Sequence, residues 1–209
     1  KVCALFLVAT LCFRGLFTFD RYMVEIFSSK EMVGVYVFYM TLIVGLYNLL
    51  EPAIFSFLYP RMLQSYQMKQ VKKYISTLRE LVISTTAGCV LLVPVIWFLL
   101  PILVGAIDDP IYADHSDGLV FFIFIGFAYS SGMVPHYALY AMRGDNWIVS
   151  AHVSSVVVFF GALEFLELES SIHLVSSAVL LSLLCAGLIK TIGMIIMHNQ
   201  SELLSTAKS

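Results

Sequence analysis

The stretch LVISTTAGCVLLVPVIWFLLPILV, residues 81–104, contains no charged side chain. It lies within a longer, mostly apolar run, 78–104. An α-helix needs about 20 mostly apolar residues to cross a hydrocarbon layer about 30 Å thick, and this run exceeds that length. It therefore predicts a membrane-spanning helix.

Five further runs of similar character accompany it, so the chain is predicted to be an all-α, polytopic membrane protein of a single six-helix unit. Hydrophobic residues make up 60% of the 209 residues and charged residues 12%, against roughly 45–50% and 25% in soluble domains. This composition excludes a soluble enzyme. The net charge of −2 leaves no basic surface for nucleic acid. The predicted spans are 2–27, 32–59, 78–104, 118–141, 147–165 and 172–197.

Basic residues favour one side of this topology. Six spans place both chain ends on the same side, and loops rich in Lys and Arg stay in the cytoplasm. We therefore expect both ends to be cytoplasmic, with Lys30 as the exception on the opposite side. The basic group is Lys1, Arg61, Lys69, Lys72, Lys73, Arg79, Arg143, Lys190 and Lys208, and the acidic group opposite is Glu31, Asp108, Asp109, Asp114, Asp117, Glu164, Glu167 and Glu169.

The first span carries a polar stripe. Its members recur every three or four residues and so share one helix face: Thr10, Arg14, Thr18, Arg21 and Glu25. Arg14 lies about 20 Å from the cytoplasmic end at about 1.5 Å per residue, and a charge at that depth costs at least about 2.5–3.5 kcal/mol. Two interpretations stay open. Arg14 presents a guanidinium to an anionic substrate in a hydrated cavity, or it pairs with Glu51 and only locks two helices together.

Further polar residues complete the candidate site. Tyr47, Asn48 and Glu51 lie within about one turn of the second span, and Pro52 after them can kink the helix. Asp20 points away from the Arg21 face and is expected to contact a neighbouring helix or the outer part of the cavity. Arg21 and Glu25 are spaced to pair with each other.

The fourth span places a histidine and two tyrosines on one face, namely Tyr129, His136 and Tyr140. An isolated histidine in such a helix is commonly a satisfied core residue. His136 is nevertheless the first candidate for pH-coupled movement, because imidazole changes charge near neutral pH.

The acidic segment 108–117 is the one cluster that suggests an active site. Clustered carboxylates hold Mg²⁺, which binds diphosphates, as an intramembrane prenyltransferase requires. A second aspartate-rich motif is missing, and the charge bias places the segment outside, so an acidic external loop is preferred. A prenyl- or acyltransferase using this segment or His136 stays an alternative. No catalytic constellation is recognised, so we expect neither an enzyme nor a cofactor or metal.

The run FDRYMVEIFSSKEMVGVYVFYMTLIVGLYNLLEPAIFSFLYPRM, residues 19–62, resembles the lipid-linked oligosaccharide flippases of polysaccharide biosynthesis. These belong to the superfamily of multidrug, oligosaccharidyl-lipid and polysaccharide exporters. Residues 137–158 look like the family's turn between two late helices. The features that carry the resemblance are the pair Asp20 and Arg21, the helix start Val33, Gly34 and Tyr36, and the helix end Pro60 and Arg61.

The resemblance implies one lobe, the C-terminal one, of a twelve- or fourteen-helix transporter like the multidrug and toxin extrusion proteins, with an N-terminal lobe missing here. It implies that an undecaprenyl-diphosphate-linked oligosaccharide, such as an O-antigen, capsule or exopolysaccharide unit, is flipped from the cytoplasmic to the periplasmic leaflet of a bacterial inner membrane by alternating access. Lipids and this substrate are the expected partners.

Under this interpretation the candidate residues divide by role. Arg14 and Arg21 replace water around the diphosphate, and Asp20 and Asn48 line the path. Four tyrosines are expected to stack on sugars, and H⁺ or Na⁺ is expected to drive the cycle through three ionisable residues. The tyrosines are Tyr36, Tyr47, Tyr129 and Tyr140, and the ionisable residues are Glu25, Glu51 and His136.

Two other functions remain open. An exporter of small cations predicts acidic rather than basic residues in the cavity, which the depth of Arg14 disfavours. A purely structural membrane subunit leaves Arg14 and Glu51 as a locking pair.

Overall fold

A computed structural model describes the backbone of residues 2–107, 109–166 and 171–206, and the side chains of 6–107, 109–116, 118–166 and 171–199. Every element in these ranges is a helix, so the all-α prediction is confirmed. The elements are α1 (Val2–Phe27), α2 (Lys30–Asn48), a π-helical turn η1 (Glu51–Phe55), α3 (Ser56–Gln67), α4 (Val71–Ile107), α5 (Pro110–Asp114), a 3₁₀ turn η2 (Ser116–Gly118), α6 (Leu119–Met142), α7 (Asp145–Phe165) and α8 (Ser171–Thr206).

Five helices in the described ranges are long and apolar enough to cross a membrane, as a helical membrane protein requires. They are the continuous unit Lys30–Gln67, formed by α2, η1 and α3, together with α4, α6, α7 and the part Ser171–Asn199 of α8. Helix α1 is not among the five, and four charged residues interrupt its apolar run. A sixth span therefore stays a prediction.

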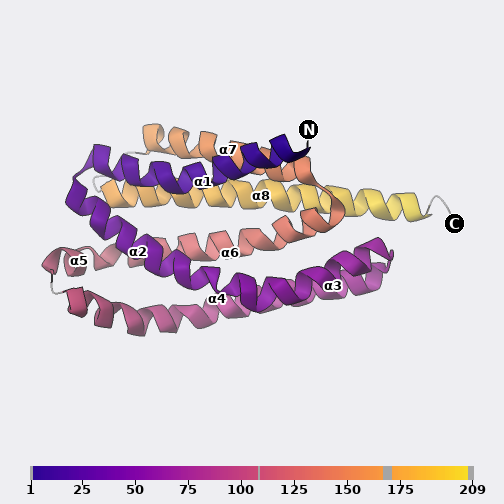
Figure 1. Cartoon of the computed structure of the whole chain (residues 1–209), viewed down its shortest axis with the longest axis horizontal. Helices are drawn as coiled ribbons and strands as arrows, with labels where there is room; N and C mark the ends of the chain where they lie inside the picture. The colour runs from indigo at the N-terminus through magenta and orange to yellow at the C-terminus, as the bar shows by residue number, and fades with distance from the viewer. Residues whose placement is uncertain (1, 108, 167–170, 207–209) are drawn as a thin grey trace.

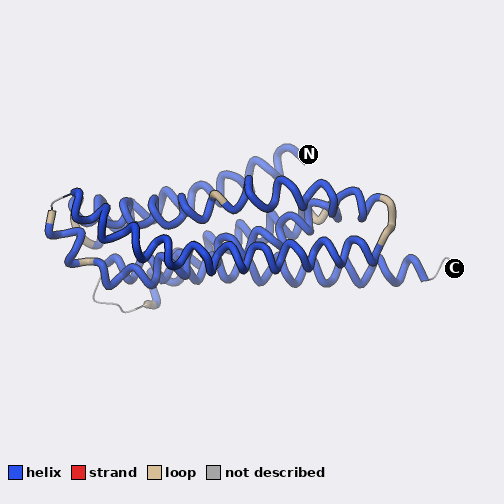
Figure 2. The backbone as a smooth tube through the Cα atoms, turned by 90° about the horizontal axis from the view of Figure 1, so that it is seen from below, coloured by secondary structure: helices blue, strands red, loops and turns tan. Residues whose placement is uncertain are grey.

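The long helices form an elongated bundle (Figures 1 and 2). Helix α8 packs along α6 and α7, α1 lies on α7, α2 lies on α6, and α3 pairs with α4. The start of α1, the α3–α4 and α6–α7 turns and the end of α8 lie toward the same end of the bundle (Figure 1). This arrangement brings Lys69 and Arg143, which belong to the two turns, to one end.

A break divides the second long helix. Helix α2 ends at Asn48 with Leu49 as its C-cap, and Glu51–Phe55 form the wide π-helical turn η1, which contains Pro52. Proline has no amide hydrogen to donate to the preceding turn, and π-helical turns interrupt the regular ladder of bonds. As a result, α3 leaves α2 at an angle and runs along α4 (Figure 1).

The interior consists of two hydrophobic clusters on either side of this break. The first surrounds α2 and α6 and includes the buried rings of Tyr36, Tyr39 and Phe122. The second lies under α3 and includes Phe55 and Met62. The break thus coincides with the boundary between two packed regions.

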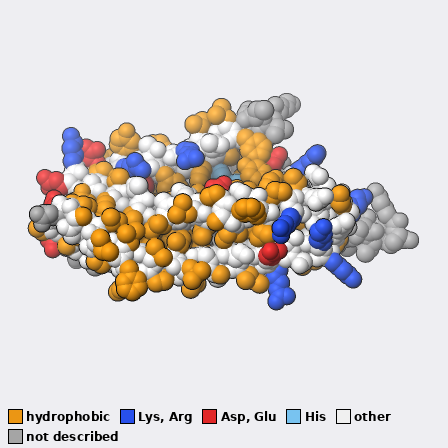
Figure 3. Space-filling model, turned by 60° about the horizontal axis from the view of Figure 1, so that its bottom comes forward, with side chains coloured by type: hydrophobic (Ala, Val, Ile, Leu, Met, Phe, Trp, Pro, Cys, Tyr) orange, Lys and Arg blue, Asp and Glu red, His pale blue; other side chains and the backbone are white. Residues whose placement is uncertain are grey.

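The outer face of α4 is apolar and exposed. Leu91, Trp97, Phe98 and Ile102 are each more than 60% accessible. Figure 3 shows apolar side chains across the middle of the molecule and most of the visible Lys and Arg side chains toward one end, with a few at the other end and near the middle. A surface of this kind suits hydrocarbon in the middle and water at the end.

Candidate functional site

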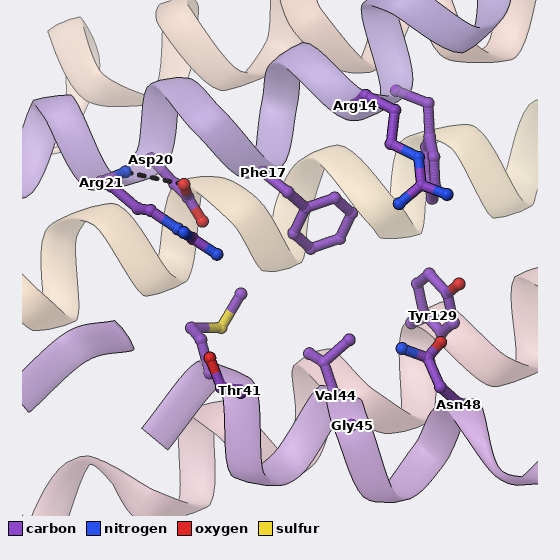
Figure 4. Close-up of a pocket in the computed structure, with 11 residues that line it drawn as sticks. Arg14, Phe17, Asp20, Arg21, Thr41, Val44, Gly45, Asn48 and Tyr129 are labelled. Carbon is purple, nitrogen blue, oxygen red and sulfur yellow. Dashed lines mark hydrogen bonds between the residues drawn. The ribbon is translucent and has the colours of Figure 1, made fainter. Parts of the chain in front are cut away.

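A cavity of about 220 Å³ lies between α1 and α2, with α6 completing its wall (Figure 4). It gathers five of the residues singled out in the sequence: Arg14, Asp20, Arg21, Asn48 and Tyr129. The rest of its wall consists of Phe13 and Phe17 of α1 and Met40, Thr41, Val44 and Gly45 of α2.

Arg14 occupies the middle of α1, and its guanidinium is exposed in the cavity, on the side of Asn48 and Tyr129 (Figure 4). Its position is about 18 Å from the start of the helix and about 20 Å from the end, at about 1.5 Å per residue. No salt bridge of Arg14 occurs within the ranges whose side chains are described. Its charge therefore faces the open space of the cavity.

Asp20 and Arg21, adjacent in α1, have different environments. The Asp20 carboxylate is 1% exposed and accepts hydrogen bonds from the Tyr36 hydroxyl at 2.9 Å and the Arg21 amide at 2.7 Å. The Arg21 side chain is exposed and, in the described part of the chain, forms no salt bridge with Glu25. The one carboxylate in the cavity wall thus has both oxygens occupied, whereas both guanidinium groups face solvent.

Glu51 lies at the start of η1 and bonds to α6 instead of α1. Its carboxylate accepts a hydrogen bond of 2.6 Å from the Tyr137 hydroxyl. The ion pair between Arg14 and Glu51, one of the two interpretations that the sequence left open, is absent from the described side chains. The break after Leu49 alters the helical register. The direction of the Glu51 side chain therefore cannot be extrapolated from the residues of α2 as if the helix were unbroken.

Tyr36 and Tyr47 belong to the hydrophobic core, not to the cavity. They are 0% and 1% exposed. Tyr47 packs against Gly126, where a Cβ atom would overlap its ring. The expectation that these two rings stack on sugars is not met in this structure, because neither ring is accessible.

The remaining predicted residues lie outside the cavity. Tyr140 contacts the His136 ring at 4.5 Å between centroids, and Glu25 is exposed on α1. His136 is 9% exposed, and its Nδ1 has no hydrogen-bond partner among the described residues. It stacks on His152 of α7 at 5.7 Å.

The sequence predicts Lys190 near the end of the last span, whereas the structure places it inside a longer helix. Helix α8 continues to Thr206, so Lys190 lies in its interior and is 5% exposed. Its Nζ lies 5.9 Å from the ring centroid of Phe13, a residue of the cavity wall. One sequence feature could have indicated a buried Lys190, namely that it is the single lysine inside the apolar run 172–197.

One aspartate of the acidic segment 108–117 has a structural role. Asp109 caps the N-terminus of α5 by accepting a hydrogen bond of 3.1 Å from the Ile111 amide. The side chains of Asp108 and Asp117, and all of Glu167 and Glu169, lie outside the described residues, as do the side chains of Lys1 and Lys208. The described side chains contain no group of three or more His, Cys, Asp or Glu able to hold a metal ion.

Comparison of the chain with protein-family models, curated proteins and solved structures gives no match. The function is accordingly argued from the cavity and its charges.

Proposed function

We propose that the chain is part of a membrane transporter that moves the anionic headgroup of a lipid-linked oligosaccharide across a bilayer. The observation that supports this best is Arg14, an arginine in the middle of an apolar helix whose guanidinium faces a cavity without a carboxylate partner among the described side chains. A charge in a membrane helix usually faces water or a partner. An anion entering the cavity supplies that partner.

The physical obstacle to flipping such a lipid is its headgroup. A diphosphate that carries sugars loses its hydration in hydrocarbon at a high cost, whereas the polyprenyl tail stays in lipid. Guanidinium groups replace water well, because each offers planar, paired N–H donors to phosphate oxygens. Arg14 and Arg21 would bind the phosphates, with Asn48 and Tyr129 donating further hydrogen bonds.

The size of the cavity indicates what it would hold. A volume of about 220 Å³ corresponds to roughly seven water molecules at about 30 Å³ each. Such a space suits a phosphate group and a few waters, not an oligosaccharide. The sugars would then lie outside this cavity, against a second lobe that faces α1 and α2.

The wider proposal is a flippase of a bacterial inner membrane, with both ends in the cytoplasm, that works by alternating access and does not catalyse a reaction. Coupling to H⁺ or Na⁺ through Glu25, Glu51 or His136 would act through helix movement, since none of the three lines the cavity. An exporter of small cations fits less well, because the two exposed charges of the cavity are positive.

A flipping assay tests the proposal. The protein is reconstituted in liposomes with a fluorescently labelled polyprenyl-diphosphate oligosaccharide, and a membrane-impermeant quencher reports the label in the outer leaflet. We expect the unmodified protein to expose inner-leaflet label and Arg14→Gln to leave it protected. Arg79→Gln, which removes an exposed arginine of α4 outside the cavity, is the matched control. Equal flipping by Arg14→Gln and the unmodified protein would contradict the proposal.

A further inference from the structure

Lys190 is a buried cation that contacts a ring of the cavity wall. Its side chain is 5% exposed, and its Nζ lies over Phe13, 5.9 Å from the ring centroid. Phe13 also lines the cavity between α1 and α2. The ring of Phe13 stacks on His152 at 4.9 Å and on Tyr129 of the cavity wall at 6.1 Å.

Two histidines lie near Lys190, and no acid pairs with it among the side chains that the structure describes. His136 and His152 stack on each other, and the Nδ1 of His152 donates to the Ala9 carbonyl oxygen at 3.2 Å. The Nδ1 of His136, which is 9% exposed, has no partner among the described residues. Asp20 and Glu51 of the neighbouring helical segments already accept hydrogen bonds from tyrosines.

In this environment the cost of burying the Lys190 ammonium group is not offset by its contacts. A cation–π contact contributes about 0.5–2 kcal/mol, whereas a charge in the middle of a membrane helix costs at least about 2.5–3.5 kcal/mol. Within the described side chains, Lys190 forms neither a hydrogen bond nor a salt bridge that would make up the difference. An anion approaching through the cavity is the complement that this group lacks.

We propose that Lys190 is a further substrate-binding residue, which reaches past Phe13 to bind the second phosphate of a lipid-linked diphosphate while Arg14 binds the first. This inference rests on the proposed function and names the residue that selects a diphosphate over a monophosphate. Lysine suits the role, because its ammonium is a compact charge with three donors on a flexible stem.

Two probes that share one tail isolate the contribution of the second phosphate. Farnesyl diphosphate and farnesyl monophosphate are titrated calorimetrically into the purified protein in detergent. We expect the unmodified protein to prefer the diphosphate by about tenfold or more, the equivalent of one charge-assisted hydrogen bond. Lys190→Met should remove most of this preference and leave monophosphate affinity within about twofold. Lys72→Met, on the exposed start of α4, should change neither.

Thermal unfolding of the protein without ligand separates binding from a structural role. Removing an unpaired buried charge relieves its desolvation cost, so Lys190→Met should unfold at a higher temperature than the unmodified protein. A lower unfolding temperature, or an unchanged preference for the diphosphate, would overturn the role of Lys190 and leave the proposed function standing. Failure of the unmodified protein to bind either probe would overturn both. If inorganic pyrophosphate binds as tightly as farnesyl diphosphate, a lipid-linked substrate is contradicted. In that case a loss of pyrophosphate affinity in Lys190→Met would still support the role of Lys190, and an unchanged affinity would overturn it.

Discussion

Asp20 and Tyr36 join α1 to α2 through a hydrogen bond of 2.9 Å from the tyrosine hydroxyl to the carboxylate. Both side chains are almost completely buried. Asp20 lines the cavity, and the neighbouring Arg21 remains exposed in it. The hydrogen bond thus links the two helices. It also engages the Asp20 carboxylate, the one acidic group among the residues that line the cavity.

We expect Tyr36→Phe to lower the free energy of unfolding by about 1.5–3 kcal/mol, because a buried carboxylate loses a hydrogen-bond donor. Thermal unfolding in detergent measures the change. Tyr22→Phe is the control, since Tyr22 is 57% exposed on α1, the helix that carries Asp20. Equal stability of the two variants would show that the buried bond contributes nothing.

The hydrogen bond between Tyr137 of α6 and Glu51 of η1 predicts that substitutions of these two residues affect stability in a coupled way. Tyr137→Phe should destabilise the protein by about 1–3 kcal/mol, because it removes a donor to a partly buried carboxylate, and Glu51→Gln should cost less, since an amide oxygen still accepts the bond. A double-mutant cycle with Glu51→Ala and Tyr137→Phe measures the coupling. Additive effects of the two substitutions would contradict the bond of 2.6 Å.

Gly126 and Gly161 provide a matched pair of glycines within helices. A Cβ atom at Gly126 would overlap the Tyr47 ring, whereas one at Gly161 meets nothing within 4 Å. Gly126→Ala should therefore lower the free energy of unfolding by about 1–3 kcal/mol through overpacking. Gly161→Ala should raise it by up to about 1 kcal/mol through helix propensity. The same sign for both would contradict the close approach of α2 and α6.

Arg143 ends α6 in the left-handed region, with φ 58° and ψ 39°. A side chain there costs roughly 1–2 kcal/mol that glycine avoids. Arg143→Gly is expected to raise the unfolding temperature, and Arg79→Gly, in the interior of α4, is expected to lower it. A fall in both variants would indicate that the Arg143 side chain contributes more than its backbone costs.

The helical architecture and the stripe on α1 were predictable from the sequence, because both are local properties. Apolar length specifies a spanning helix without reference to any partner. The spacing of Arg14 and Arg21 places them on one face of a helix, and both line the cavity.

Contacts between helices were less predictable. The partner of Glu51 depends on the turn η1, which alters the helical register after Leu49 in a way that spacing does not reveal. Tyrosine is a residue type typical of sugar-binding surfaces, but Tyr36 and Tyr47 are buried because they pack against α1 and α6. Lys190 was misplaced because the apolar run ends well before the helix does.

The π-helical turn at Glu51–Phe55 has a mechanical consequence. It lies between two separately packed clusters, one around α2 and α6 and the other under α3. Proline has already removed one backbone bond that would resist a change in the angle between α2 and α3 at this point, whereas Ile54 of the turn packs against both clusters. The turn begins three residues after Asn48 of the cavity wall, so a rotation of α2 about it would change the shape of the cavity.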